Sequence, residues 1–431
     1  MLPSVSPENA PLRANTRHLM HDAAWFGVLA ASTMAFLSVF ATRLGASTFQ
    51  VALLTAGPAM VNLLASIPFG RWMEGRSLAR VTFRSSLWTR LGYLLLVPVP
   101  ALVPEGAGVW AVIIITVLMS VPGTLLAISF NALFADLVPP DWRAFVVGRR
   151  NALLSVALTA TVLVSGWLLD HLAFPGNYQW VFAIGALGAL LSSYHLGKLV
   201  APSDDQLPPR VGKPLLDIAR PGEMRPLDAP RSYSGLRFLT RAHGGRLLRL
   251  DLLRGSFGGF LLAYLAFYTF QYLPQAVFPV FWVRELRLTD GDIGLGSALF
   301  YLAMMVTSFA LRRVTGFFGH RRLLHVSSLL YSVYPFLTWM AQDATLFWIA
   351  SFLGGAVWGL LNGALINRLM ERVPENDRPA HMVLHNLALN LGILVGSLLG
   401  PALAASFDVR GAMLGAGVMR LLGGLVLILG A

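Results

Sequence analysis

Long apolar runs constrain this chain more than any other feature of its sequence. We count twelve of them, and most approach or exceed the roughly 20 residues that an α-helix needs to cross a bilayer. They cover residues 23–42, 50–70, 82–103, 109–137, 149–169, 178–199, 254–283, 293–311, 323–341, 345–370, 381–404 and 411–430. Interior prolines such as Pro58 and Pro274 need not end these helices, because neighbouring helices in a bundle satisfy the carbonyl groups that proline frees. The sequence therefore predicts an all-α membrane protein with twelve transmembrane helices.

Composition argues against soluble classes of protein. Hydrophobic residues make up 56% of the chain and charged residues only 13%, whereas soluble domains carry about 25% charge. The absence of cysteine excludes a disulfide framework, a thiolate nucleophile and a cysteine-based zinc site. The net charge of +12 resides in short loops between apolar runs, not on one folded face. We therefore expect membrane lipid, and not nucleic acid, as the partner of these basic residues.

The basic residues alternate between loops, which predicts the orientation of the chain. One set of loops is rich in arginine and the intervening set is poor in it, with only Arg43, Arg284, Arg287 and Arg410. Because cytoplasmic loops carry the excess of basic residues, both termini are predicted to be cytoplasmic. The first apolar run is longer than the apolar core of a signal peptide, so we interpret it as a retained helix. A multi-pass protein of the cytoplasmic membrane is expected.

The apolar runs divide into two groups of six. We predict a cytoplasmic tail at 1–22, a six-helix bundle at 23–199, a cytoplasmic linker at 200–250 and a second six-helix bundle at 251–431. The linker is rich in proline at first. Its last part, 236–250, interleaves leucine with arginine and is typical of an amphipathic segment on the inner leaflet; binding of a regulatory partner is the alternative.

Two polar loops repeat one another at half the length of the chain, which is typical of an internal duplication. Val138, Pro139, Arg143 and Asn151 match Val373, Pro374, Arg378 and Asn386 at a constant offset of 235, and Asp136 corresponds to Glu371. The two bundles are therefore predicted to be related by a pseudo-two-fold repeat. The predicted topology places both loops on the cytoplasmic side.

Twelve helices in two groups, a long central loop and this repeat resemble the major facilitator superfamily. The best local marker is Gly70-Arg-Trp-Met-Glu74-Gly75-Arg76 after the second helix, which is similar to the loop signature of that family. A shorter version, Gly316-Phe-Phe-Gly319-His-Arg321-Arg322, follows the eighth helix. The resemblance implies that this loop latches the two bundles on the cytoplasmic side. It also implies that a substrate passes between the bundles by alternating access.

The polar loops supply candidates for a gate at the cytoplasmic mouth. An acid ends one helix and an arginine begins the next in both halves of the chain. The candidate gating residues are Glu74, Asp136, Arg143, Glu371 and Arg378. Solvated loops that obey the charge rule are the alternative interpretation.

The seventh helix carries the clearest polar stripe. Tyr264, Tyr268 and Gln271 recur at three- and four-residue steps, so they share one helix face with Phe260 and Gln275. A glutamine side chain finds no partner in lipid and should turn inward. The resemblance implies that helices one, four, seven and ten line the cavity, which adds further candidate substrate-binding residues: Thr33, Met34, Asn131, Trp358 and Asn362. Helix–helix contacts are the alternative role for the stripe.

Three charged residues in or near predicted helices need a partner. Arg90 lies close to the inner interface and is expected to extend its side chain towards water. Asp22 lies at the start of the first predicted helix, where the helix dipole favours an acid; a proton site is the alternative. Arg420 lies near the middle of the last helix, where it binds an anion or a carbonyl group at a helix break. The glycine ladders at Gly355, Gly359, Gly363, Gly392, Gly396 and Gly400 predict close helix contacts.

The sequence contains only incomplete versions of soluble-enzyme motifs. His381 and His385 have the spacing of a zinc-protease helix but lack its glutamate. The glycines at 291–296 have the wrong spacing for a dinucleotide loop. We find no nucleophile–base constellation, and we predict no catalytic residue, metal site or cofactor.

These observations predict a permease that moves a small molecule across the cytoplasmic membrane. A monomer is expected. Aromatic, amide and methionine side chains suit a neutral, amphipathic or aromatic substrate. Arg90 and Arg420 leave an anionic substrate as an alternative. Multidrug efflux coupled to protons is the alternative within transport. A membrane-embedded enzyme acting on lipid and a sensor that does not transport are the alternatives from other classes.

Overall fold

The computed structural model describes residues 10–73, 75–201, 250–373 and 378–430, and every regular element within these ranges is helical. The predicted linker at 200–250, with its amphipathic segment, lies almost wholly outside the described residues. Glu74 lies outside them as well.

The first bundle consists of helices α1 to α8. Its elements are α1 (Ala10–Leu29), a π-helical turn (Ala30–Met34), α2 (Ala35–Arg43), α3 (Thr48–Met73), α4 (Leu78–Leu96), α5 (Val99–Leu102), α6 (Glu105–Leu137), α7 (Pro140–His171) and α8 (Gly176–Leu196). The prediction that the first helix begins at residue 23 is wrong, because α1 begins at Ala10. Asn15 and His18 anchor this early part of α1 to Val200 and His195 at the end of the bundle.

The second bundle consists of helices α10 to α16. Its elements are a 3₁₀ turn (Leu250–Arg254), α10 (Ser256–Tyr272), a 3₁₀ turn (Leu273–Gln275), α11 (Val277–Val280), a π-helical turn (Phe281–Glu285), α12 (Asp290–Leu330), α13 (Val333–Met340), α14 (Ala344–Arg372), α15 (Arg378–Phe407) and α16 (Val409–Gly430). The predicted eighth helix lies within α12, and the predicted ninth helix covers the end of α12 and all of α13. They are separated at Gly319, whose φ of 72° lies in a region open to glycine.

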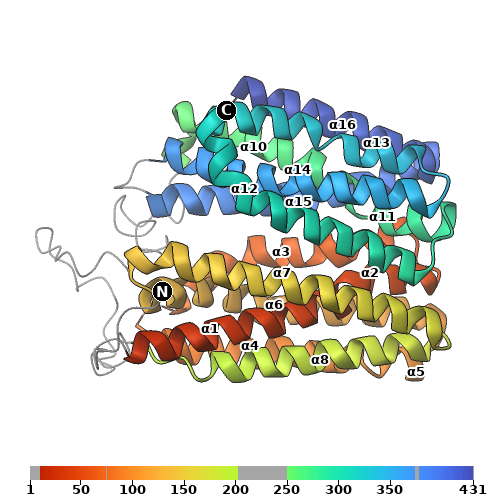
Figure 1. Ribbon diagram of the computed structural model, residues 1–431, viewed down its shortest axis with the longest axis horizontal. Helices are drawn as coiled ribbons and strands as arrows, with labels where there is room; N and C mark the ends of the chain where they lie inside the picture. The colour runs from red at the N-terminus through yellow and green to blue at the C-terminus, as the bar shows by residue number, and fades with distance from the viewer. Residues whose placement is uncertain (1–9, 74, 202–249, 374–377, 431) are drawn as a thin grey trace, which may run out of the picture.

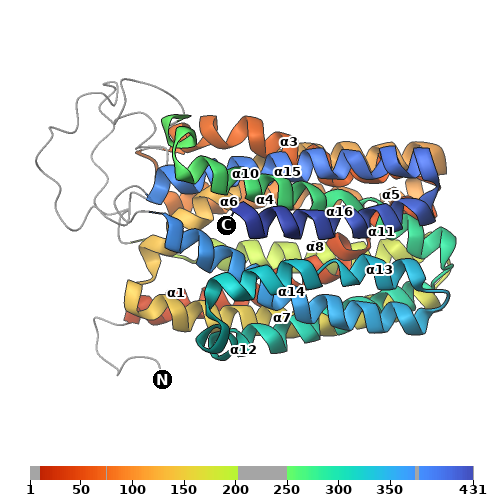
Figure 2. The ribbon, with the colours of Figure 1, turned by 90° about the horizontal axis from the view of Figure 1, so that it is seen from above.

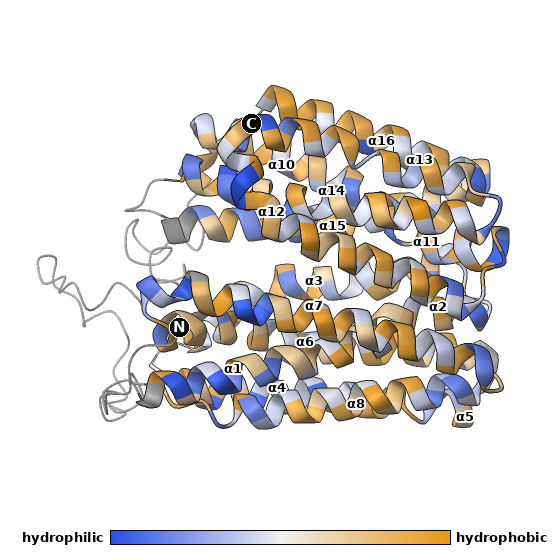
Figure 3. Cartoon of the chain, viewed as in Figure 1, coloured by the Kyte–Doolittle hydropathy of each residue, from blue (hydrophilic) through white to orange (hydrophobic). Residues whose placement is uncertain are grey.

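Eight stretches among the described residues are long and apolar enough to cross a membrane, and the one at Asp290–Met340 is long enough for two crossings. Helices α4 and α10 are not among these eight stretches, and the structure shows why. Helix α10 is broken at Leu273–Gln275, and α4 carries Arg80, Arg84 and Arg90. Figure 3 shows hydrophobic residues along the lengths of the helices and hydrophilic residues gathered at both ends of the molecule.

The two bundles lie side by side with their helices roughly parallel to one long axis. Figure 1 shows α1–α8 in the lower half of the view and α10–α16 in the upper half. Figures 1 and 2 both place the beginning of α1 and the end of α16 at the left. We call this the terminal end of the molecule. The opposite end, where α2 stops at Arg43 and α12 starts at Asp290, is the far end.

The hydrophobic cores join the bundles at the far end. One core cluster contains Phe40 and Tyr178 from the first bundle together with Phe278 and Phe281 from the second. A smaller cluster joins Ala41, Val51 and Ile113 to Ala276 and Val280 in the same way. Towards the terminal end the clusters are separate. The cluster around Leu19, Leu133 and Leu137 lies within the first bundle, and the cluster around Phe260, Tyr264 and Leu365 lies within the second.

The glycine ladders make the close contacts that their spacing predicts. A Cβ added at Gly392 would lie 2.7 Å from Tyr268 Cβ. Added Cβ atoms at Gly396 and Gly400 would overlap backbone atoms of α10 and of the 3₁₀ turn that follows it, respectively. On α14, Gly355 and Gly359 face the backbone of α12 in the same manner. Since no side chain larger than hydrogen fits at these positions, the prediction of small-residue helix contacts is confirmed.

Candidate functional site

An arginine and an aspartate join the two bundles at the far end. Arg43 is the last residue of α2, and Asp290 is the first residue of α12. Arg43 Nη2 lies 3.0 Å from Asp290 Oδ1, and Arg43 Nε donates to the same oxygen over 3.2 Å. Arg43 also donates to the Leu288 carbonyl oxygen over 2.7 Å. The Asp290 side chain is only 8% exposed, so this ion pair is screened much less than one on an open surface.

A second contact across the bundles caps the start of α12. Asp170, in the last turn of α7, accepts a hydrogen bond from Thr289 Oγ1 over 2.9 Å and one from the Gly291 amide over 3.0 Å. Thr289 is itself the N-cap of α12, in a capping box with Asp292. A carboxylate at this position neutralises the positive end of the helix dipole. Asp170 therefore stabilises, from one bundle, the first turn of a helix in the other.

The backbones of α7 and α12 approach closely beside this cap. A Cβ added at Gly166 would lie 3.2 Å from the Asp290 carbonyl oxygen and 3.3 Å from Gly294 Cα. Nearby, Arg284 Nη2 donates to the Ala46 carbonyl oxygen over 2.6 Å.

We call Arg43, Asp170, Arg284, Thr289 and Asp290 the far-end latch. Six hydrogen bonds between described residues join the two bundles here, and each of them involves a residue of the latch. The latch was not predicted from the sequence, although Arg43 and Arg284 are two of the few basic residues in the arginine-poor loops.

The candidate gate at the terminal end shows contacts within single bundles. Arg143 donates to the carbonyl oxygens of Val138 and Ala135, over 3.0 and 2.8 Å, and so caps the end of α6. Glu371 accepts from Arg368 over 2.9 Å, within α14. Asp136 is half-buried near the end of α6. Arg378 begins α15, but its side chain, like the whole of Glu74, lies outside the described residues.

The polar stripe of α10 lies inside the second bundle. Tyr264, which is fully buried, donates to the Leu365 carbonyl oxygen of α14 over 2.9 Å. Tyr268 Oη lies 2.9 Å from His385 Nε2 of α15. Gln271 is 6% exposed, and its side-chain oxygen has no hydrogen-bond partner. Gln275, at the end of the same stripe, is exposed. In this conformation the stripe holds α10 against its neighbours.

The other candidate substrate residues differ in their exposure. Thr33 is fully buried against Gly185 of α8. Its neighbour Met34 is 47% exposed at the end of a π-helical turn, a feature frequent at functional sites. Asn131 and Asn362 are exposed. Trp358 is half-buried and stacks on Tyr331 with ring centroids 5.2 Å apart. Met34, Asn131, Trp358 and Asn362 are therefore the candidates whose side chains are not enclosed in this conformation.

A charged network inside the first bundle corrects two expectations. Asp22 accepts from Ser192 Oγ over 2.7 Å and from Arg150 Nη2 over 3.4 Å, and Arg90 Nη2 donates to Ser192 Oγ over 3.3 Å. Arg90 is 4% exposed, so the expectation that it extends towards water is wrong. Asp22 lies in the second half of α1, because the helix begins at Ala10, and is not at a helix start. The network joins α1, α4, α7 and α8.

Arg420 binds a carbonyl group at a helix break. This is one of the two partners expected from the sequence, the other being an anion. Its Nη2 donates over 2.7 Å to the Gln271 carbonyl oxygen, where α10 gives way to the 3₁₀ turn containing Pro274. The guanidinium group lies 4.4 Å from the centroid of the Tyr331 ring, a distance suited to a cation–π contact. Arg420 is 2% exposed, so in this conformation it supports the break in α10.

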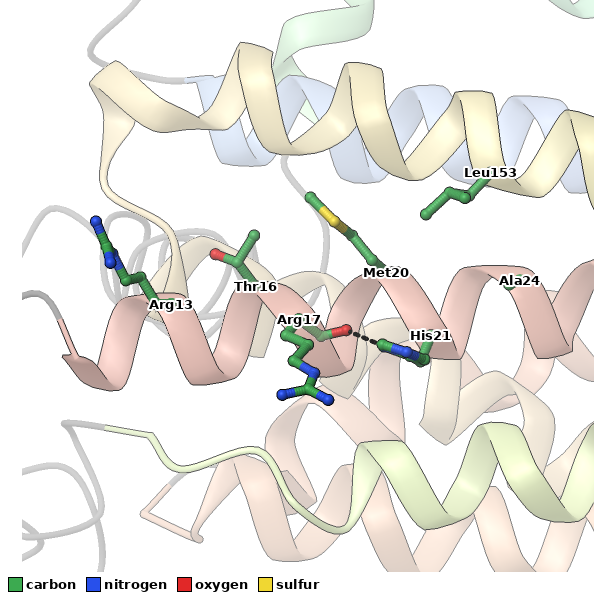
Figure 4. A pocket seen from close by; sticks show the side chains of 7 residues that line it. All are labelled: Arg13, Thr16, Arg17, Met20, His21, Ala24 and Leu153. Atoms are coloured by element: carbon green, nitrogen blue, oxygen red, sulfur yellow. Dashed lines mark hydrogen bonds between the residues drawn. The ribbon is translucent and has the colours of Figure 1, made fainter. Parts of the chain in front are cut away.

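A cavity of about 420 Å³ lies beside α1 and α7 at the terminal end. Figure 4 shows Met20 and Leu153 between these two helices, with His21 bonded to the Arg17 carbonyl oxygen over 2.7 Å. Close by, His18 Nδ1 lies 3.0 Å from His195 Nδ1. Within the described ranges no group of three or more His, Cys, Asp or Glu side chains is arranged to hold a metal ion.

Comparisons with known proteins agree with this architecture. The family model described as Major Facilitator Superfamily matches residues 23–275 and 260–431. A comparison with curated protein sequences gives no match.

Solved structures of transporters have the same fold. A variant of the nucleoside transporter NupG superposes with a TM-score of 0.70 at 10% identity, covering 96% of this chain and 99% of that one. A D-xylose–proton symporter gives 0.69 at 13% identity, covering 97% of each chain. A POT family transporter in complex with a thioalcohol-conjugated peptide gives 0.67 at 11% identity, covering 96% and 95%. At these identities the likeness concerns the fold alone. It confirms the predicted twelve-helix, all-α membrane architecture.

Proposed function

Because the chain belongs to the Major Facilitator Superfamily, we propose that it moves a small molecule across the cytoplasmic membrane by alternating access. Membership makes it a multi-pass secondary transporter and not an enzyme. We propose that the conformation described here is the one that is open towards the terminal end.

The uneven connection between the bundles carries this proposal. At the far end the bundles share hydrophobic cores and the far-end latch. Towards the terminal end each bundle has a core of its own. Two rigid bodies joined at one end and separate at the other can rock about a site between them, and this is the motion that alternating access requires.

The charge of the loops supports an orientation for this state. Arginines gather in the loops of the terminal end, so the terminal end is proposed to face the cytoplasm and the far end to face outwards. In this orientation the far-end latch is the outer gate, and it is closed. When the protein opens outwards, Arg43, Asp170 and Asp290 would exchange their partners for water.

The gating candidates of the terminal end belong to the opposite half of the cycle. We propose that Asp136, Arg143, Glu371 and Arg378, with Glu74, form contacts across the bundles when the cytoplasmic mouth closes. In the present conformation Arg143 binds carbonyl oxygens of its own bundle and Glu371 binds Arg368, and we propose that these side chains change partners when the mouth closes.

The exposed candidates favour a neutral, amphipathic or aromatic substrate. Met34 and Trp358 offer apolar and aromatic contacts, while Asn131 and Asn362 offer amide groups. Tyr264, Tyr268, Gln271 and Thr33 are enclosed in this conformation, so we propose that they contact substrate only after the bundles rearrange. The two buried arginines of the spans, Arg90 and Arg420, have protein partners, which reduces the case for an anion.

Proton-coupled efflux of drug-like molecules is the second candidate. Asp22 favours it, because this carboxylate is 3% exposed and lies among Ser192, Arg150 and Arg90 inside the first bundle. Intramembrane acids of this kind are frequent in proton relays.

Flux into proteoliposomes tests the proposed function. Purified protein is reconstituted and offered a broad panel of radiolabelled solutes, with and without a pH gradient. We expect protein-dependent, saturable flux of at least one neutral or amphipathic solute. Absence of flux for the whole panel, together with the appearance of a modified lipid, would contradict transport and favour a lipid-acting enzyme.

A further inference from the structure

A basic groove opens between α3, α4 and α6 at the terminal end, beside the loop that joins α3 to α4. Its volume is about 480 Å³. Three arginines and two tryptophans dominate its lining: Arg76, Arg80, Arg84, Trp72 and Trp88. No carboxylate lines the groove within the part of the chain that the structure describes.

The arginines of the groove are available to an external anion. Arg76, Arg80 and Arg84 are all exposed, and the ion pairs found among described residues include none of the three. Arg76 donates from Nε to the Trp72 carbonyl oxygen over 2.8 Å and stacks 3.9 Å from the centroid of the Trp72 ring. This contact fixes one guanidinium group at the mouth and leaves its Nη groups to bind a ligand.

The groove changes from basic to apolar along its length. Arg80, Arg84 and Trp88 recur every four residues and so share one face of α4. At a rise of 1.5 Å per residue, Trp88 lies about 12 Å further from the loop than Arg80. Pro122 and Leu125 of α6 line the same groove, and Trp88 is 67% exposed. A soluble phosphate would use only the basic part, whereas a phospholipid would use both parts.

We propose that this groove is a binding site for one anionic phospholipid of the inner leaflet, with its phosphate at Arg76, Arg80 and Arg84 and an acyl chain along Trp88. Basic pockets between membrane helices on the cytoplasmic side suit such headgroups. Tryptophan is at home at the interface between headgroups and acyl chains. The site is independent of the transported substrate.

Native mass spectrometry of the full-length protein tests the site. The protein is released from detergent micelles after titration with phosphatidylglycerol or with phosphatidylcholine. We expect one phosphatidylglycerol to be retained at concentrations at which phosphatidylcholine is lost. The double variant R80Q/R84Q should bind phosphatidylglycerol roughly thirtyfold more weakly, since the loss of each arginine near the headgroups weakens binding by roughly fivefold and the two losses multiply.

Two further variants separate a built site from general attraction. R321Q/R322Q removes two exposed arginines from the second bundle and should leave the retained lipid in place. Trp88→Ala should weaken phosphatidylglycerol binding while all three groove arginines remain. Thermal unfolding of each variant in detergent checks that it is folded; the single variant Arg84→Gln serves if the double variant is not.

Three results would overturn the proposal. The first is an equal loss of lipid in R80Q/R84Q and R321Q/R322Q, which would indicate attraction by net charge alone. The second is equal retention of phosphatidylcholine. The third is displacement of the signal by millimolar glycerol 3-phosphate, which would assign the groove to a soluble phosphate.

Discussion

Asp290 is the residue whose loss should most directly open the outer side of the protein. Asp290→Asn keeps the size of the side chain but removes its charge, so Arg43 loses its ion pair. Because Arg43 is 26% exposed, we expect a shift of about 1–2 kcal/mol towards the outward-open state, less than for a fully buried pair. Labelling of a cysteine placed at Ala46, which is 1% exposed in the closed state, should become faster, and it reports on this site alone because the chain has no other cysteine.

Glu285→Gln is the matched control for this variant, because Glu285 is an exposed acid at the same end. Its labelling rate should match that of the parent. If Asp290→Asn labels no faster than Glu285→Gln, the ion pair does not hold the outer side closed.

Asp22 distinguishes the two candidate functions at the scale of one residue. Asp22→Asn can keep the contact with Ser192 but leaves Arg150 and Arg90 without a counter-charge. We expect a loss of stability of about 2–4 kcal/mol, slightly below the range for a fully buried ion pair because the Arg150 side chain is 24% exposed. The measurement is thermal unfolding in detergent, with Asp141→Asn, at an exposed position of the same bundle, as the control.

Flux assays on the same variant then decide the role of this carboxylate. Where Asp22→Asn retains flux but no longer responds to a pH gradient, Asp22 carries the proton of an antiporter. Flux and pH response both equal to those of the parent would leave Asp22 with a structural role.

Gln271 tests whether the stripe of α10 has a function beyond packing. Its backbone carbonyl holds Arg420, while its side-chain oxygen has no partner. Gln271→Ala should therefore leave the protein folded, with thermal stability within about 1 kcal/mol of the parent, and yet reduce flux several-fold. Unchanged flux would remove this side chain from the substrate path.

Among the elements, the contact between α10 and α15 rests on glycine. An added methyl group at Gly396 would overlap the Thr269 carbonyl oxygen, so Gly396→Ala should destabilise the second bundle by about 1–3 kcal/mol through overpacking. Gly259, in α10, has nothing within 4 Å of its added Cβ. Gly259→Ala should be neutral or stabilising, because alanine favours a helix by about 1 kcal/mol over glycine. Equal unfolding temperatures for the two variants would contradict the packing argument.

The elements also show what sequence could predict. Apolar length and small-residue spacing are local properties, so the helices and the glycine ladders followed from the sequence. The start of α1 did not, because Arg13, Arg17, His18 and His21 interrupt its apolar pattern while tertiary contacts keep it helical. The far-end latch did not either. Arg43 and Asp290 are 247 residues apart, and only the packing of one bundle on the other brings them together.

The whole molecule consists of two bundles joined at one end. Its hydrophobic cores, its ion pair and its helix cap all place the closed side at the far end, and the repeat at the terminal end supplies residues for the opposite gate. Alternating access requires that the far end opens when the terminal end closes.

Distances between paired spin labels test that requirement most directly. The terminal pair is Gly148→Cys with Gly316→Cys, and both positions are exposed with nothing within 4 Å of an added Cβ. The far pair joins Gly106→Cys, which is equally open, to Gln342→Cys in an exposed loop of the second bundle. Each pair is measured by double electron–electron resonance in lipid nanodiscs, with the parent latch and with Asp290→Asn. We predict that Asp290→Asn shortens the terminal distance and lengthens the far distance. Distances that both stay fixed, or that both change in the same direction, would contradict alternating access between these two ends.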